Sequence, residues 1–171
     1  MTTDIKNNAI DAIEVLKADH AAVEKLFEAF ERTDDGDLDA KGTLVRRACE
    51  LLTVHAMVEE EILYPAARDV LPEVDKSDVD EALVEHFLVK TLIEKFESLT
   101  PGADGFDATF KVLSENVRHH VEEEEGELFP ELRKTKTDLA LLGEQLLKRK
   151  EFLFEIFCHF DRILSELGRA V

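Results

Sequence analysis

Hydrophobic residues recur along this chain at alternating steps of three and four, which is the pattern of an α-helix with one buried face. The first stripe predicts a helix over residues 10–30, and its members are Ile13, Leu16, His20, Val23, Phe27 and Phe30. Similar stripes predict helices over about 41–68, 77–99 and 106–133, and a fifth over about 138–167. The pattern therefore predicts an all-α protein.

Each of the first four stripes contains a histidine among its apolar residues. These are His20, His55, His86 and His120. A side chain at a stripe position faces the neighbouring helices, so all four imidazoles are expected to point inward. The same helix faces carry two acidic residues, Glu59 and Glu124.

The four helices form an internal repeat of two hairpins. Asp19-His20 corresponds to Glu85-His86, and residues 55–65 correspond to residues 120–130 without a gap. Two such hairpins are expected to pack as an antiparallel up-down four-helix bundle with approximate twofold symmetry. The matching polar positions would then meet at a central site.

Each repeat ends on an aromatic residue followed by proline, in Tyr64-Pro65 and Phe129-Pro130. Proline has no N–H to donate within a helix. We therefore expect a kink or a helix end at both positions.

The composition favours long helices in one domain. The chain has 171 residues, of which 44% are hydrophobic, and only seven glycines and four prolines interrupt it. This length favours a single domain over residues 1–171, with hairpins over about 10–68 and 77–133 and an additional C-terminal helix over about 138–168.

The formal net charge of −18 argues against nucleic acid or an anionic membrane as a partner, because phosphate groups attract basic side chains. It is compatible with binding cations. The chain shows neither a basic start followed by an apolar run nor an apolar stretch long enough to span a bilayer. The expected compartment is the cytoplasm.

The histidines and acids are spaced for binding metal. His55 and Glu59 are four residues apart, as are His120 and Glu124, so each pair projects in one direction from its helix. A buried carboxylate costs several kcal/mol unless it is paired or binds a metal. The predicted ligands are His20, His55, Glu59, His86, His120 and Glu124.

Imidazole and carboxylate ligands suit iron, manganese or zinc, and two facing carboxylates favour a pair of ions. No cysteine falls at the site, which removes the usual argument for structural zinc. Cys49 and Cys158 are interpreted as small buried apolar residues. The Glu-x-x-His pattern of ferritin-type di-iron bundles is absent, because here the histidine precedes the acid.

These motifs, in the order Asp19-His20, His55-x3-Glu59, Glu85-His86 and His120-x3-Glu124, resemble the hemerythrin and HHE cation-binding domains over about residues 10–133. The resemblance implies a four-helix bundle with a non-haem di-iron centre that carries an oxo or hydroxo bridge. It implies that Glu59 and Glu124 bridge the irons, that His20 and His55 serve one iron, and that His86 and His120 serve the other.

The chain departs from the oxygen-carrying hemerythrins at Lys90, where they place a further histidine four residues after the one on the third helix. One iron would then take water or another ligand, and reversible oxygen carriage is less strongly implied. Glu60, Glu123 and Glu125 are alternative ligands, although each is more readily interpreted as a solvated acid.

Three further features are interpreted without a metal role. His119 lies about 100° around the helix from His120, so it should face a neighbouring helix or solvent. His159 lies beside the stripe of the fifth helix and suits a surface or interface position. The acidic loop at residues 35–39 lacks the glycine and glutamate of a calcium loop, since Ala40 and Arg46 occupy those positions.

Three functions remain open at this stage. The first is a di-iron protein that binds or senses O2, NO or iron itself. The second is a di-iron enzyme that acts on peroxide or nitrogen oxides. The third is an adaptor protein whose fold is stabilised by a structural metal, with a homodimer formed through the C-terminal helix.

Overall fold

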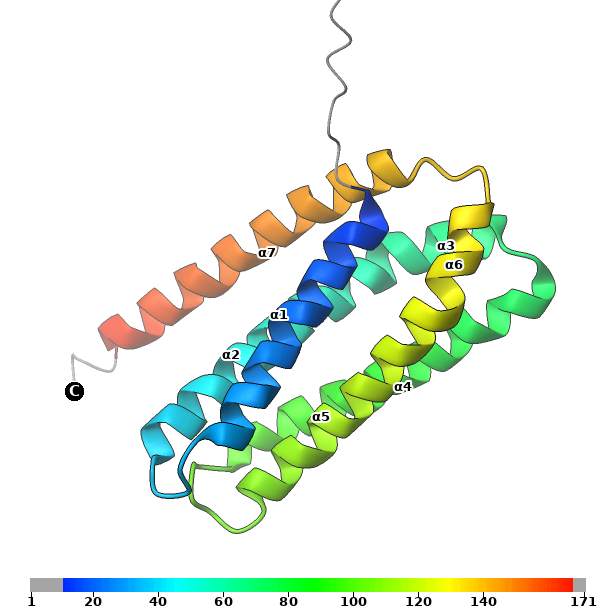
Figure 1. The fold of residues 1–171 in the computed structure, drawn as a ribbon. Helices are drawn as coiled ribbons and strands as arrows, with labels where there is room; N and C mark the ends of the chain where they lie inside the picture. Colours follow the sequence, from blue (N-terminus) through cyan, green and yellow to red (C-terminus); the bar gives the residue numbers. More distant parts are fainter. Residues whose placement is uncertain (1–10, 168–171) are drawn as a thin grey trace, which may run out of the picture.

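The computed structural model describes the backbone of residues 11–167 and the side chains of residues 11–159. Four long antiparallel helices form a bundle (Figure 1): α1 (Ala12–Arg32), α2 (Leu38–Val58), α4 (Lys76–Lys95) and α5 (Phe106–Glu123). The predicted all-α architecture, a four-helix bundle with an added C-terminal helix, is confirmed.

Polar caps and glycines set the helix ends. Asp11 precedes α1 and accepts a hydrogen bond from the backbone N–H of Glu14, and Asp37 caps α2 in the same way. Such a cap is worth about 1 kcal/mol, and it starts α2 three residues before the predicted position. Gly105 precedes α5 with φ 87°, a left-handed backbone conformation that residues other than glycine rarely adopt.

The second helix of each hairpin continues through a single widened turn. Helix α2 passes through η1 (Glu59–Leu63) into α3 (Tyr64–Val70), and α5 passes through η4 (Glu124–Leu128) into α6 (Phe129–Lys134). In both turns a backbone N–H reaches back five residues, from Tyr64 to Glu59 and from Phe129 to Glu124.

The irregularity that the two prolines predict is a π-helical turn in each repeat. Pro65 and Pro130 cannot donate the regular helical hydrogen bond, and a turn with one extra residue accommodates the missing donor without ending the helical path. The widened turns begin at Glu59 and Glu124 themselves. The irregularity therefore lies at the predicted site.

Two short 3₁₀ turns complete the connections, η2 (Glu73–Asp75) before α4 and η3 (Phe96–Ser98) after it. Together α4 and η3 cover the third predicted helix. Helix α7 (Leu139–Leu167) follows α6 after a short loop.

The hydrophobic core consists of two clusters. One lies toward the α3 and α6 end and includes Leu16, Val58, Leu63, Leu128 and Leu146. The other lies toward the opposite end and includes Phe27, Val45, Phe110, Leu113 and Val117. On α1 and α4 the buried histidine lies between residues of the two clusters, and His55 and His120 pair with these histidines at the same level. The apolar core is thus divided by a polar layer.

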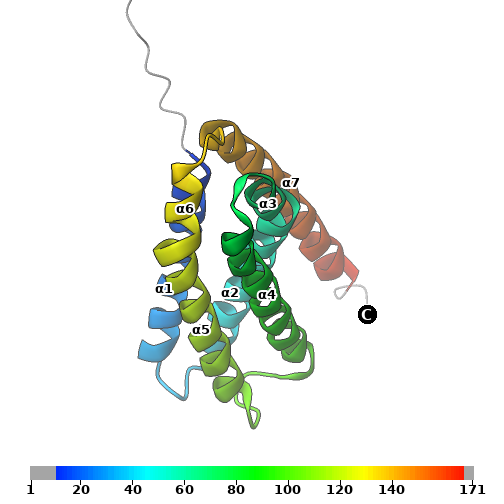
Figure 2. The same ribbon diagram turned by 90° about the vertical axis from the view of Figure 1, so that its right-hand side faces the viewer.

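Helix α7 packs on the outside of the bundle against α1 and α2. Figure 1 shows it running beside α1, and Figure 2 shows it on one side of the four-helix bundle. Leu146 and Leu153 are buried there, and Arg149 forms a 2.6 Å ion pair with Glu61. The helix therefore covers the bundle, while Phe152 and Ile156 remain exposed. The last part of the fifth predicted helix, residues 160–167, lies outside the described side chains.

Among the described residues, no helix combines the length and the apolar character needed to cross a membrane.

Candidate metal centre

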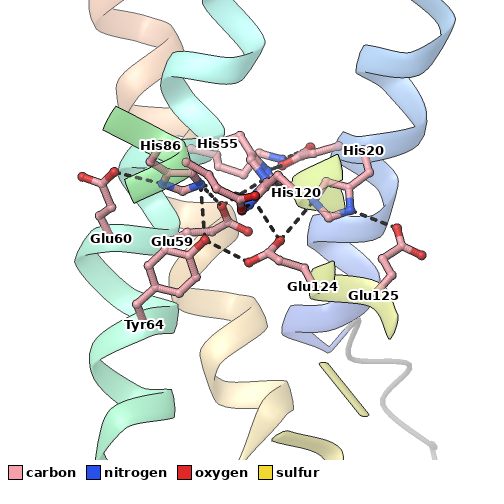
Figure 3. A network of polar contacts seen from close by, with 12 residues as sticks. His20, His55, Glu59, Glu60, Tyr64, His86, His120, Glu124 and Glu125 are labelled. Carbon is pink, nitrogen blue, oxygen red and sulfur yellow. Dashed lines mark hydrogen bonds and ion pairs between the residues drawn. The ribbon is translucent and has the colours of Figure 1, made fainter. Parts of the chain in front are cut away.

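All six predicted ligands lie together in the polar layer (Figure 3). Each is buried, and each long bundle helix and each π turn contributes to the set: His20, His55, Glu59, His86, His120 and Glu124. Their ligand atoms fall into two groups. His20, His55, Glu59 and Glu124 form one group, and Glu59, His86 and His120 form the other, with the atoms of each group within 4.8 Å of one another.

The Nε2 atoms of the four histidines face the inside of the layer. The Nε2 atoms of His20 and His55 lie 3.2 Å apart, and those of His86 and His120 are also 3.2 Å apart. The four rings thus form two pairs that follow the internal repeat. Each pair combines one residue from the first helix of a hairpin with one from the second.

The two buried carboxylates each contact both pairs. Oε2 of Glu59 lies 3.0 Å from Nε2 of His55 and 3.3 Å from Nε2 of His86. Oε2 of Glu124 lies 3.5 Å from Nε2 of His20 and 3.5 Å from Nε2 of His120. Both carboxylates therefore lie where groups shared by two ions would be.

The outer nitrogen of every histidine contacts a further carboxylate. In the first helices of the hairpins, Nδ1 of His20 lies 2.9 Å from Glu125 and Nδ1 of His86 lies 2.9 Å from Glu60. A carboxylate only accepts, so Nδ1 carries the proton and the Nε2 lone pair is directed inward.

The second helices repeat the arrangement. Nδ1 of His55 lies 3.4 Å from Asp19, and Nδ1 of His120 lies 2.8 Å from Glu85. Carboxylates that hold the outer nitrogen in this way fix ring orientation and raise the basicity of metal-binding histidines. Sequence reasoning missed this role, although Asp19 and Glu85 stand beside the histidines in the repeat.

The structure also revises the interpretation of Glu60 and Glu125. The sequence predicts either alternative ligands or solvated acids at these positions. Their carboxylates are instead partly buried on the outer side of His86 and His20. The acids are thus hydrogen-bonded supports of the histidines.

Three buried carboxylate oxygens have no hydrogen-bond partner among the described residues: Oε1 and Oε2 of Glu59, and Oε2 of Glu124. Unpaired buried charge is strongly unfavourable. A metal cation would satisfy these oxygens and the inward Nε2 lone pairs together. The chemistry of the donors therefore fits bound metal.

In the metal-free protein, protons partly take the place of a cation. Burial alone would lower the pKa of His55, but the charge of Glu59 and the contact with Asp19 outweigh burial and raise the pKa to about 10. Burial alone would raise the pKa of Glu59, yet His55 and His86 hold it well below its usual value. Metal binding would have to displace the proton from His55.

Tyr64 is a further site residue that sequence reasoning assigned only to the helix end. Its buried hydroxyl donates a 2.9 Å hydrogen bond to Oε1 of Glu124 and lies 3.2 Å from Nε2 of His86. Burial and the charges of Glu59 and Glu124 raise the pKa of this phenol. The repeat partner is Phe129, which has no hydroxyl and stacks on His20, so the centre is chemically asymmetric.

A small cavity lies against the four histidine rings. Its volume is about 20 Å³, close to the space that one water molecule needs. Its other walls are mainly apolar and include Val23, Leu52, Ala56, Val89, Val117 and Val121. The cavity therefore has room for one very small molecule.

The sequence of residues 11–132 matches the family model of the hemerythrin HHE cation binding domain. The chain belongs to this family. Membership confirms the resemblance carried by the ordered His and Glu motifs. Domains of this family bind metal ions, typically iron.

The curated relatives of this HHE domain are longer proteins. A DNA nickase of Nostoc sp. is 31% identical over 122 residues, which is 70% of this chain and 33% of the relative. An uncharacterized hemerythrin-like protein of Schizosaccharomyces pombe is 32% identical over 83 residues, which is 48% of this chain and 41% of the relative. The chain thus spans about a third to two fifths of these relatives.

A solved structure shares the fold. The crystal structure of a hemerythrin HHE cation binding domain-containing protein from Mycobacterium kansasii superposes with a TM-score of 0.70 and 22% sequence identity. The match covers 84% of this chain and 87% of the other.

Lys90 of this HHE domain turns away from the polar layer. Its Nζ lies 2.6 Å from both carboxylate oxygens of Glu60, and its side chain is 44% exposed. Glu60 in turn contacts Nδ1 of His86, so Lys90 is linked to this histidine only through the Glu60 carboxylate. Lys90 therefore does not occupy the place of the further histidine ligand.

The remaining polar candidates lie outside the layer. His119 is exposed, as expected, and faces Glu123 and Glu85. His159 is exposed. Cys49 is partly buried, with a thiol pKa that burial raises to about 12, whereas Cys158 is exposed. The prediction that both cysteines are buried is wrong for Cys158, because its position lies about 100° around α7 from Phe157, which packs against the core.

Proposed function

We propose that this HHE domain binds two iron ions and that the pair binds a small molecule such as O2 or NO. The supporting observation is the placement of Glu59 and Glu124, which contact histidines of both halves and three of whose four buried oxygens have no hydrogen-bond partner among the described residues. His20 and His55 would hold one iron, and His86 and His120 the other. Both glutamates would be shared between the two ions.

The donor set supports iron over its alternatives. Four imidazoles and two carboxylates suit iron and manganese, while structural zinc sites are usually four-coordinate and rich in cysteine. Family membership adds to this preference. Manganese and zinc remain the alternatives to be separated by metal analysis.

The cavity limits what can reach the proposed centre. The histidine rings form one wall and aliphatic side chains form the others, so the space suits an uncharged diatomic molecule better than a hydrated ion. An iron pair would supply electrons or open coordination positions to such a molecule. The aliphatic wall would exclude bulk water from it.

The hydroxyl oxygen of Tyr64 lies beside the His86 half of the centre. The further histidine of oxygen-carrying hemerythrins is replaced there by Lys90, which is paired with Glu60. The Tyr64 hydroxyl lies 3.2 Å from Nε2 of His86, so it is within reach of an ion held by His86 and Glu59. We propose that it serves this half as a ligand or as a hydrogen-bond donor.

Addition of NO to the ferrous protein tests the binding function. We expect a new optical absorption that saturates at a fixed ratio of NO to protein and that is lost in His86→Ala. The matched variant His119→Ala should behave like the unaltered protein. An iron-loaded protein whose spectrum does not respond to NO or O2 would contradict the proposed ligand role.

The Tyr64 hydroxyl also favours a second candidate function, the disproportionation of hydrogen peroxide. In that reaction two peroxide molecules yield two water molecules and one O2, so protons must move between oxygen atoms, and a buried hydroxyl could relay them. Steady-state O2 evolution from peroxide, strongly reduced in Tyr64→Phe, would support the enzyme. Ligand binding without turnover would contradict it.

The name of the Nostoc relative does not change this proposal. The HHE domain corresponds to a third of that protein, and a net charge of −18 opposes contact with a phosphate backbone. We therefore propose no nucleic-acid partner for this domain.

A further inference from the structure

An acidic cavity lies between α4 and the junction of α5 with η4. Its volume is about 40 Å³. Six carboxylates line it: Asp78, Glu81, Glu85, Glu123, Glu124 and Glu127. One of these, Glu124, is a buried member of the metal centre, so the cavity connects the surface acids with the central layer.

The charge around this cavity is not balanced by basic side chains. Among the side chains of residues 11–159, no lysine or arginine lies within ion-pair distance of its five outer acids, Asp78, Glu81, Glu85, Glu123 and Glu127. Elsewhere the acids around the centre do have such partners. Lys17 lies 2.7 Å from Glu125, Lys90 lies 2.6 Å from Glu60, and Lys150 contacts Asp19.

Glu85 is thus the one histidine-supporting acid without a lysine among the described residues. Its partner on the outer side is His119, whose Nε2 lies 3.8 Å from Oε1 of Glu85 and 3.3 Å from Oε1 of Glu123. The ligand atoms of these three residues lie within 4.8 Å of one another. His119 is 63% exposed, so the group is accessible from solvent.

Glu85 links this outer group to the centre. Its Oε1 faces His119, while its Oε2 lies 2.8 Å from Nδ1 of His120. Glu124 lines the same cavity as Glu85 and Glu123. It is 2% exposed, and its Oε2, which faces His20 and His120, has no hydrogen-bond partner among the described residues. A buried carboxylate with one unpaired oxygen in the wall of an acidic cavity would attract a divalent cation.

We propose that divalent cations reach the metal centre through this acidic cavity, held first by Glu85, His119 and Glu123 and then passed to Glu124. This inference rests on the proposed metal centre, because that centre is the site to which the cations would move. The outer group offers the same imidazole and carboxylate chemistry as the inner one, but with weaker enclosure. It would therefore hold a cation briefly and release it inward.

The opening beside His20 suits cations less well. It is lined by Lys17 and Arg118 as well as by Glu24 and Glu125, and these four side chains pair with one another at 2.7 and 2.8 Å. Two positive charges at that opening offset its two acids. Electrostatic attraction would direct an incoming cation to the unbalanced cavity instead.

The rate of Co²⁺ uptake by the metal-free protein tests this route, since the visible absorption of Co²⁺ reports binding to nitrogen and oxygen ligands. The variant combines Glu81→Gln, Glu123→Gln and Glu127→Gln. At low ionic strength we expect uptake to slow roughly tenfold, with an unchanged final ratio of Co²⁺ to protein. The slowing should shrink as salt is added.

The matched control removes three exposed carboxylates outside the cavity, by Glu28→Gln, Glu115→Gln and Glu144→Gln. It should load within about twofold of the unaltered rate, because net charge alone acts weakly at a distance. Equal rates for the two triple variants would overturn the route. His119→Gln tests the role of the imidazole in the outer group, because it leaves every carboxylate in place. An unchanged loading rate in this variant would also contradict the proposal.

These outcomes are distinguishable from failure of the centre itself. A protein that takes up no Co²⁺ at all, or whose cavity variant loses the final stoichiometry while His86→Ala retains it, would contradict the proposed centre. Slow but complete loading is the result specific to the route. Circular dichroism of each variant confirms that its helices are intact.

Discussion

The hydroxyl of Tyr64 donates a 2.9 Å hydrogen bond to Oε1 of Glu124, which joins the first hairpin to the second inside the polar layer. The π turn that ends before Tyr64 directs its ring into this position. Its repeat counterpart, Phe129, supplies no such bond. The two halves of the centre therefore differ in one hydroxyl group.

Tyr64→Phe removes that hydroxyl while retaining the ring. In the metal-free protein it leaves Oε1 of Glu124 without its donor, so we expect the free energy of unfolding to fall by roughly 1–3 kcal/mol. In the iron-loaded protein we expect two bound irons and an altered NO or O2 spectrum. Chemical denaturation and optical titration measure these effects. Unchanged stability and spectra would show that the hydroxyl has no role.

The acids on the outer nitrogens give a second prediction. Glu60→Ala frees Nδ1 of His86, so metal affinity should fall about 10–100-fold, as is usual when such a support is lost. The repeat-related variant Glu125→Ala should have a similar effect through His20. Competition with a chromophoric chelator measures both.

Lys90→Ala is the matched control for this support. It removes the 2.6 Å contact to Glu60 but leaves the bond from His86 to Glu60 in place. The affinity should fall less than in Glu60→Ala. A larger loss for Lys90→Ala would mean that the lysine acts directly on the centre.

The pH dependence of stability should differ between the metal-free and metal-loaded proteins. In the metal-free protein the pKa of His55 is raised to about 10, against about 6.5 in the unfolded chain. The native state then holds the extra proton between these values. Its stabilising effect is complete below about pH 6.5 and is lost as the pH rises toward 10.

Glu59 changes the stability in the opposite direction with pH, because His55 and His86 lower the pKa of its carboxyl group. Its contribution is present above its unfolded pKa, about 4.3, and is lost as the pH falls below that value. Thermal unfolding across the pH range should therefore show a decline above pH 6.5 for the metal-free protein. Bound metal replaces the proton, so the loaded protein should not show this decline. Parallel curves would contradict the proposed competition.

The sequence alone was sufficient for the bundle and for the residues that meet at its centre. The stripes gave the helices because burial of one face dominates helix packing. Histidine and glutamate at buried stripe positions stood out because a polar group there needs a compensating partner. The internal repeat then brought the two halves together without any structural information.

Other parts of the centre could not be predicted in this way. Tyr64 resembled an ordinary core aromatic, and the position of its hydroxyl depends on the widened turn. Glu60 and Glu125 occupy positions that are typical of solvated acids, and their contacts depend on the register between separate helices. Proline predicted an irregular turn but not the insertion of one residue that keeps the helix continuous.

The iron content of the protein after anaerobic loading with Fe²⁺ and removal of unbound metal tests the proposed centre most directly. We predict two irons per chain in the unaltered protein, retained in His119→Ala and reduced to one or fewer in His86→Ala. A content of one iron or less per chain in the unaltered protein, or two irons that persist after His86→Ala, would contradict a di-iron centre built on these histidines and on Glu59 and Glu124.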